Sequence, residues 1–304
     1  MGLDKSALLA ALPEKAERYL GKMPAALKSL GGGSFGKAFR LDFPDGERLV
    51  IKAYRVEGMN ETEAFQLRLL GSHTHVPMPQ VLFTAENLLG MSYIEGHDVL
   101  TGPGFLLKAK ALRQRFAEAV IDGMLPWHDT EGPAFGYVTG PNHKTWPEFY
   151  RTIVDEVIAA LPTLGIAQKQ KDSIYAATER FGDIVWYDGT PRLIHGDLNV
   201  MNIMADPKTF RLTGFIDPFN SMWADPEYDL FQLNLLTGKR FGLLGSYQAK
   251  RRTSGRCELK IAYYAAVNEA LAYLRSGIKF ELNHIICDRR LRREMQRAGM
   301  KTEI

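Results

Sequence analysis

Residues 193–230 of this chain read LIHGDLNVMNIMADPKTFRLTGFIDPFNSMWADPEYDL, and this stretch decides the fold. Three polar residues in it, Asp197, Asn202 and Asp217, each stand beside a short apolar run that is typical of a strand. A magnesium ion takes oxygen ligands, usually one or two from protein and the rest from phosphate and water. The pattern therefore indicates a magnesium–phosphate site in which one carboxylate stays free to orient a hydroxyl group. The alternative is that Asp197 and Asp217 are ordinary turn carboxylates.

The motif HGDLNVMN resembles the catalytic loop of the aminoglycoside phosphotransferase and choline kinase-like family, roughly H-G-D-x-x-x-x-N. The run IDPFNSMWADPEYDL is similar to that family's I-D-x7-G-D-P-x-x-D-L. The resemblance implies a protein-kinase-like fold, in which one Asp accepts the substrate proton while an Asn and a second Asp hold Mg²⁺. By this resemblance, Asp197 is expected to be the base, and Asn202 and Asp217 are expected to be the metal ligands. The chain departs from the family pattern at Asn199, Pro218 and Ala224.

A glycine-rich run, LGGGSFGKA, occupies residues 30–38. It matches G-x-G-x-x-G and nearly matches Walker A, but Ala38 lacks the hydroxyl that Walker A offers to magnesium. The Walker and dinucleotide motifs also need a helix to follow, whereas the apolar pattern and the turn at 44–47 predict two strands. Protein kinases have this same order of a strand, a glycine-rich loop and a second strand. By the resemblance, the loop that contacts the phosphates of ATP comprises Gly32, Gly33, Ser34, Phe35 and Gly36.

Other nucleotide-binding residues follow from the same resemblance. Lys52 lies in the apolar run LVIKAY, where a lysine needs a partner or a ligand. In the kinase arrangement it pairs the α- and β-phosphates and a helix glutamate. The run EAFQLRLL resembles the family's E-A-x-x-L-x-x-L and selects Glu63 over Glu61. The run LLGMSYIEGHDV resembles the hinge between kinase lobes, so adenine is expected to bond backbone groups of Ser92 and Ile94.

The pattern of elements predicts an α+β fold, and the family resemblance implies that it is protein-kinase-like with two lobes. We expect an N-terminal helical extension over residues 1–24, with helical spacing at 3–20. An antiparallel-sheet lobe that binds the nucleotide then covers residues 25–94, and a mainly helical lobe that is catalytic and binds the acceptor covers 95–304. Helices are expected at 61–70, with Gly71 as its C-cap, and at 105–124, 146–161, 168–181, 229–236, 259–274 and 289–298.

The amino-acid sequence also gives indications of where in the cell the protein is found. No apolar run approaches the ~20 residues that a membrane span needs, and the N-terminus lacks the basic start of a secretory signal. The two cysteines, Cys257 and Cys287, fit no metal spacing and are interpreted as free thiols. These features favour a cytoplasmic protein.

The C-terminal segment is basic. Residues 235–304 hold 15 Lys and Arg against 6 Asp and Glu, whereas the whole chain carries a net charge of only +3. Such a segment could bind an anionic substrate, nucleic acid or a membrane surface. A helical face exposed to solvent is the simpler interpretation. No nucleic-acid partner is expected, because few aromatic residues interrupt the basic run.

The functional hypothesis is an ATP- and Mg²⁺-dependent phosphotransferase that acts on a hydroxyl group of a small molecule. Two alternatives stay open. One is a nucleotide-binding pseudokinase without turnover, although all the expected polar groups are present. The other is an atypical protein kinase, which is disfavoured because the chain lacks an A-P-E motif and a long activation segment.

Overall fold

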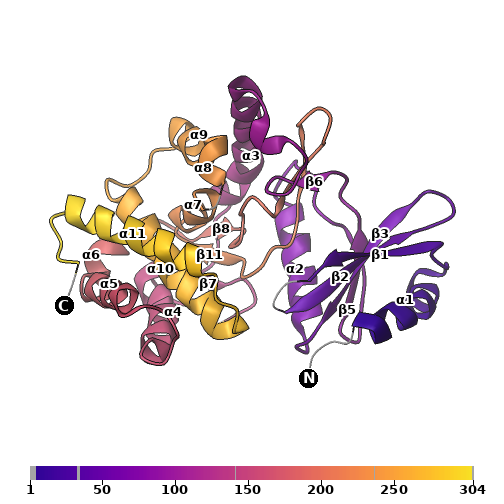
Figure 1. The fold of residues 1–304 in the computed structure, drawn as a ribbon, viewed down its shortest axis with the longest axis horizontal. Helices are drawn as coiled ribbons and strands as arrows, with labels where there is room; N and C mark the ends of the chain where they lie inside the picture. Colours follow the sequence, from indigo (N-terminus) through magenta and orange to yellow (C-terminus); the bar gives the residue numbers. More distant parts are fainter. Residues whose placement is uncertain (1–4, 33–34, 141, 236, 303–304) are drawn as a thin grey trace.

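The computed structural model describes residues 5–32, 35–140, 142–235 and 237–302, and it has the expected α+β fold. Figure 1 shows the larger antiparallel sheet and α1 (Lys5–Leu20) at one end of the molecule and helices α4, α5, α10 and α11 at the other. No helix in the described ranges is long and apolar enough to cross a bilayer. The two expected free cysteines, Cys257 and Cys287, are both unbridged and buried.

The N-terminal sheet has five strands in the order β1-β2-β3-β5-β4, all antiparallel. Its strands are β1 (Ala26–Gly31), β2 (Gly36–Asp42), β3 (Arg48–Tyr54), β4 (Val81–Ala85) and β5 (Leu88–Ser92). Side chains alternate between the two faces of a strand. On β3, Leu49, Ile51 and Ala53 therefore join the small core that also holds buried α1 residues, such as Leu12 and Ala16.

The other face of β3 belongs to the large core of the molecule. Val50 and Tyr54 lie in that core together with Ala64 and Leu67 of α2 (Met59–Gly71). Lys52 lies between Val50 and Tyr54 in the alternation, so its side chain also emerges on the α2 face. This period-two pattern is why a lysine in the centre of the sheet meets a glutamate on α2.

The C-terminal part is mainly helical. Its helices are α3 (Lys110–Asp129), α4 (Trp146–Ala160), α5 (Gln168–Glu179), α6 (Phe181–Ile184), α7 (Glu227–Leu233), α8 (Gly238–Phe241), α9 (Leu243–Lys250), α10 (Cys257–Ser276) and α11 (Glu281–Arg297). Its short strands are β6 (His97–Asp98), β7 (Gly136–Tyr137), β8 (Arg192–Ile194), β9 (Ile203–Ala205), β10 (Leu212–Phe215) and β11 (Met222–Ala224). They form two three-stranded sheets, β10-β9-β6 and β7-β11-β8. These short sheets carry the loops on which the candidate site is built.

Some helix boundaries differ from the sequence prediction. The expected helix at 105–124 is instead a 3₁₀ turn at Phe105–Leu107 and the separate helix α3, because Lys108 and Ala109 are extended. Gly71 is not the C-cap of α2, since the helix includes it and Ser72 follows as the cap. The last helix starts at Glu281 rather than 289. In its first turns the apolar residues Leu282 and Ile286 are exposed, whereas the buried positions are His284 and Cys287, so no apolar stripe marked this part of the helix.

The basic C-terminal arginines divide into two sets. Arg290 is buried and pairs with Glu258 at 2.9 Å, and Arg292 pairs with Asp288 at 3.1 Å. The exposed set comprises Arg289, Arg293 and Arg297. A solvated face therefore describes only the exposed set, whereas Arg290 joins α11 to α10 through Glu258.

Candidate active site

An ion-pair bridge joins the sheet, α2 and the loop after β10. Lys52 Nζ lies 2.7 Å from Glu63 Oε2 and 2.5 Å from Asp217 Oδ1. Tyr54 also donates its hydroxyl to Glu63. Glu61, the other candidate on the same helix, is exposed. The structure therefore brings Lys52, Glu63 and Asp217 together from three elements that are distant in sequence.

Asp197 lies in the loop between β8 and β9, and side-chain amides surround its carboxylate. Oδ1 accepts hydrogen bonds from Asn199 Nδ2 at 2.9 Å and Gln232 Nε2 at 3.0 Å. Oδ2 accepts one from Asn202 Nδ2 at 3.1 Å, and the same nitrogen donates to the Asp197 carbonyl at 2.7 Å. These bonds hold the carboxylate in one orientation without giving it a cationic partner.

The two aspartates have opposite pKa shifts. Burial raises the pKa of Asp197 to about 7, and the nearby Asp217 carboxylate adds to that effect, although the bonds from Asn199 and Asn202 oppose it. Partial burial would also raise the pKa of Asp217, but the Lys52 ammonium outweighs this and lowers that pKa. Divergent pKa values of neighbouring carboxylates are a feature of sites that separate a proton acceptor from a permanent anion.

The loop that carries Asp217 has a strained backbone close to Asp197. Asp217 and Asn220 have positive φ angles, 55° and 57°, a region that residues other than glycine rarely adopt. Gly196, next to Asp197, has φ 82°, and a Cβ atom there would lie 2.3 Å from the carbonyl oxygen of Asn220. The glycine of the HGD motif is therefore required by both conformation and space. Strained residues cluster at functional sites, which supports a role for this loop.

The glycine-rich loop joins β1 to β2. Of its predicted residues, Gly33 and Ser34 lie outside the described ranges. The ring of Phe35 stacks on Phe219, two residues after Asp217, with centroids 4.9 Å apart. A Cβ atom on Gly36 would lie 2.6 Å from the carbonyl oxygen of Ala53, so only glycine fits there. The stacked rings bring the loop against the segment that carries Asp217.

The predicted hinge residues lie at the end of β5. The Ser92 N–H donates to the Gln80 carbonyl at 2.9 Å, so this N–H group is already paired. The side chain of Ile94 lies against β10, because a Cβ atom on Gly214 would be 2.6 Å from Ile94 Cγ2. The hinge thus packs against the strand that leads to Asp217.

Asn202 and Asp217 have the donor atoms that magnesium prefers. Asn202 directs its amide nitrogen at Asp197, which leaves its oxygen Oδ1 for a cation. The Asp217 side chain is 48% exposed and carries a negative charge. The described residues contain no cluster of three His, Cys, Asp or Glu side chains that could hold a metal by itself. Two protein oxygens fit a cation whose other ligands come from phosphate and water.

Sequence reasoning gave no role to Gln232 or Asp229, which support the Asp197 loop. Gln232 on α7 bonds Asp197 directly. Asp229, fully buried on α7, accepts the N–H groups of His195 at 3.0 Å and Gly196 at 2.8 Å. In the sequence, Asp229 could have been found only by its place in the D-P-x-x-D-L motif. No motif or periodic pattern pointed to Gln232. His128 on α3 lies 3.0 Å from the Tyr247 hydroxyl and 3.4 Å from Asp229.

Replacing Asp229 by Ala should destabilise the fold, because two buried N–H groups would lose their acceptor. Each unsatisfied buried group costs about 1–3 kcal/mol. Chemical denaturation should show a lower free energy of unfolding for Asp229→Ala, and a smaller loss for Asp229→Asn, which keeps one acceptor oxygen. Equal stability of Asp229→Ala and the wild type would show that these bonds do not hold the loop.

Known proteins that resemble this chain include phosphotransferases. The model of the phosphotransferase enzyme family matches residues 27–248. Macrolide 2'-phosphotransferase type I superposes with a TM-score of 0.67 and 21% identity, covering 96% of this chain and 99% of that chain. The GDP complex of aminoglycoside 2'-phosphotransferase-IIIa superposes with a TM-score of 0.68 and 18% identity, covering 95% of this chain and 99% of that chain. At these identities the superpositions show a shared fold.

A curated relative matches over a shorter length. The uncharacterized protein YcbJ of Escherichia coli strain K12 is 24% identical over 126 residues, which are 40% of this chain and 42% of YcbJ. The matched part of the chain therefore spans about two fifths of that relative.

Proposed function

Because this chain belongs to the phosphotransferase enzyme family, we propose that it transfers the γ-phosphate of ATP to a hydroxyl group of a small molecule. The observation that carries the proposal is the bridge from Lys52 to Glu63 and Asp217, next to Asp197, for which no residue in the described ranges is a cationic partner. In phosphoryl transfer, such a lysine–glutamate pair and a metal-binding aspartate position the phosphates.

In this proposal Lys52 contacts the α- and β-phosphates, and Glu63 holds its ammonium in place. Burial opposes the charged form of Lys52, but Asp217 and Glu63 outweigh burial and raise its pKa, so the lysine remains cationic. The glycine loop, Gly32, Gly33, Ser34, Phe35 and Gly36, covers the phosphates. The hinge at Ser92 and Ile94 offers backbone groups to the adenine ring.

Asn202 and Asp217 would hold Mg²⁺. When bound, the ion neutralises charge on the phosphate oxygens. The negative charge of Asp217, which the Lys52 ammonium maintains, favours a cation at this place.

Asp197 would accept the proton of the substrate hydroxyl as the oxygen attacks the γ-phosphate. Its carboxylate is held by Asn199, Asn202 and Gln232, so the acceptor oxygen is already oriented before the substrate arrives. Most of the rate increase would come from positioning and charge stabilisation rather than from covalent chemistry. Residues 25–94 would serve as the nucleotide-binding lobe, 95–304 as the catalytic and acceptor-binding lobe and 1–24 as an extension, in a cytoplasmic protein.

A panel of small hydroxyl compounds, monitored by ADP release, tests this proposal. We expect ADP release that depends on Mg²⁺ and increases with one class of compound. A pseudokinase would bind the nucleotide without any release. An atypical protein kinase would release ADP only with a protein acceptor.

Replacing Lys52 by Met should raise the KM for ATP more than it lowers kcat, because the lysine binds phosphates that are present before the transition state. The matched control is Lys28→Met on β1, which removes a lysine outside the bridge and should leave both constants unchanged. Steady-state kinetics with varied ATP give both values. An unchanged KM for ATP in Lys52→Met would remove this lysine from the nucleotide site.

A further inference from the structure

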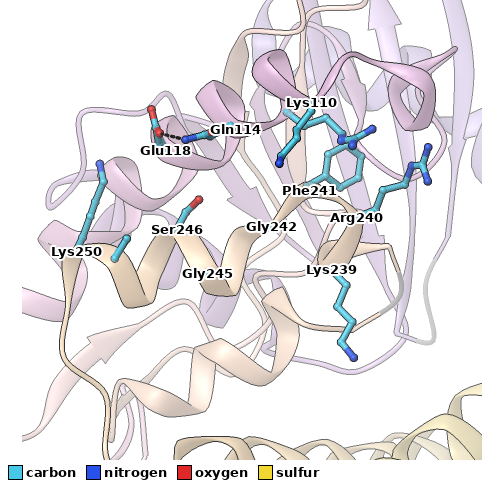
Figure 2. Close-up of a pocket in the computed structure, with 12 residues that line it drawn as sticks. Lys110, Gln114, Glu118, Lys239, Arg240, Phe241, Gly242, Gly245, Ser246 and Lys250 are labelled. Atoms are coloured by element: carbon cyan, nitrogen blue, oxygen red, sulfur yellow. Dashed lines mark hydrogen bonds between the residues drawn. The ribbon is translucent and has the colours of Figure 1, made fainter.

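A second pocket lies away from the candidate active site, between α3, α8 and α9. It is a surface pocket of about 400 Å³. Figure 2 shows α3 on one side and α8 and α9 on the other, with Lys110 and Ser246 extending into the space between them. No described residue of the proposed ATP, magnesium or base sites lines it. It is therefore a separate feature of the C-terminal part.

Cations dominate the lining. Glu118 is the single carboxylate among the described lining residues, and Gln114 donates to it at 3.2 Å. The cationic lining residues are Lys110, Arg113, Lys239, Arg240 and Lys250.

Few of these charges are neutralised within the protein. Lys250 pairs with Asp122. Arg113 donates to the Lys108 carbonyl at 2.9 Å and Arg240 to the Leu106 carbonyl at 2.6 Å. A backbone carbonyl orients a guanidinium but does not cancel its charge. For Lys110 the structure shows no ion pair with any residue in its described ranges. The pocket therefore keeps a net positive charge.

The backbone adds to that positive charge. Two helices, α3 and α9, begin at this pocket, and neither has a side-chain cap or an acidic residue in its first turn. The first N–H groups of a helix have no partner within the helix, and the helix dipole makes this end positive. Lys110 and Arg113 stand at the start of α3, and Arg240 shortly before α9, where cations are unfavourable. An anion bound between the two helix starts would relieve this repulsion.

We propose that the pocket between α3, α8 and α9 binds a small anion that carries two or more phosphate groups. The volume suits a small molecule. Lys110 and Arg113 on α3 and Arg240 on α8 place cations on two elements, which suits a ligand with more than one charged group. Guanidinium groups with helix N-terminal N–H groups are typical phosphate binders. The site is independent of the proposed transfer reaction.

Inorganic pyrophosphate, titrated calorimetrically without magnesium and with EDTA present, is the probe. We expect saturable binding that is tighter than that of orthophosphate at equal ionic strength and weakens with added salt, because exposed charges are screened. The double variant Lys110→Gln/Arg113→Gln should bind about tenfold more weakly, having lost two charge-assisted contacts. The control Arg289→Gln/Arg297→Gln removes the same charge from exposed positions on α11 and should bind like the wild type.

A second pair of variants tests the place of binding within the pocket. Ser246→Asp and Ser246→Asn introduce side chains of equal size on α9, and only the first adds a negative charge. Pyrophosphate should bind much more weakly to Ser246→Asp than to Ser246→Asn. Lys52→Met, altered in the proposed ATP site, should bind pyrophosphate normally.

Three results would overturn the proposal. The first is no pyrophosphate binding by the wild type. The second is an equal loss in the α11 control, which would indicate a general charge effect. The third is a loss confined to Lys52→Met, which would assign the binding to the ATP site.

Discussion

Asp197→Asn should reduce kcat about 10²–10⁴-fold and leave ATP affinity nearly unchanged, since losing a positioned general base typically has that effect. The substitution keeps the size of the side chain. An Asn oxygen can still accept from Asn199 and Gln232, while the bond from Asn202 to Oδ2 is lost. We therefore expect a folded protein that binds the nucleotide but does not turn it over. Steady-state kinetics and nucleotide titration measure the two effects separately.

The matched control is Asp188→Asn, which makes the same change at an exposed position before β8. It should have wild-type kinetics. Near-full activity of Asp197→Asn, with the control also active, would remove Asp197 from the proton-transfer step. A loss of nucleotide binding in Asp197→Asn would show that the residue acts on binding instead.

Asp217→Ala should abolish magnesium-dependent nucleotide binding. The substitution removes a carboxylate that would hold the metal and leaves Lys52 with Glu63 as its remaining acidic partner. A bound metal ion that neutralises phosphate charge would contribute several kcal/mol, so the affinity loss should exceed about tenfold. Calorimetry with a nonhydrolysable ATP analogue, with and without Mg²⁺, measures it directly.

For this variant the magnesium dependence itself is the decisive quantity. The wild type should bind the analogue more tightly with Mg²⁺ than without it, and Asp217→Ala should show no such difference. Asp188→Ala serves as the control and should behave like the wild type. Unchanged Mg²⁺-dependent affinity in Asp217→Ala would contradict the metal-ligand assignment.

The sequence predicted the parts of this protein that depend on local patterns. Strand alternation in β3 decides which face Lys52 occupies, and motif spacing in residues 193–230 decides that Asp197 and Asp217 follow short strands. Both patterns are short-range, so they can be seen without coordinates. The kinase-like fold, the shared family and the pairing of Lys52 with Glu63 rather than Glu61 all agree with the structure.

The contacts that sequence patterns did not reveal join distant segments. Gln232 bonds Asp197, which lies 35 residues earlier in the sequence, and Phe35 of the glycine loop stacks on the distant Phe219. Neither contact has a periodic or motif signal, because each depends on how α7 and the glycine loop pack in three dimensions. Helices α8 and α9 were also missed, since Gly238, Gly242 and Gly245 make this stretch resemble a loop.

The central claim is transfer of the ATP γ-phosphate to a small molecule. The most direct test is to incubate the purified protein with γ-labelled ATP, Mg²⁺ and a protein-free metabolite extract, and then to separate ATP, phosphate, small molecules and protein. We predict label in a new small-molecule fraction with the wild type and none there with Asp197→Asn. Label found only in protein, or label that stays in ATP while the nucleotide is bound, would contradict the account.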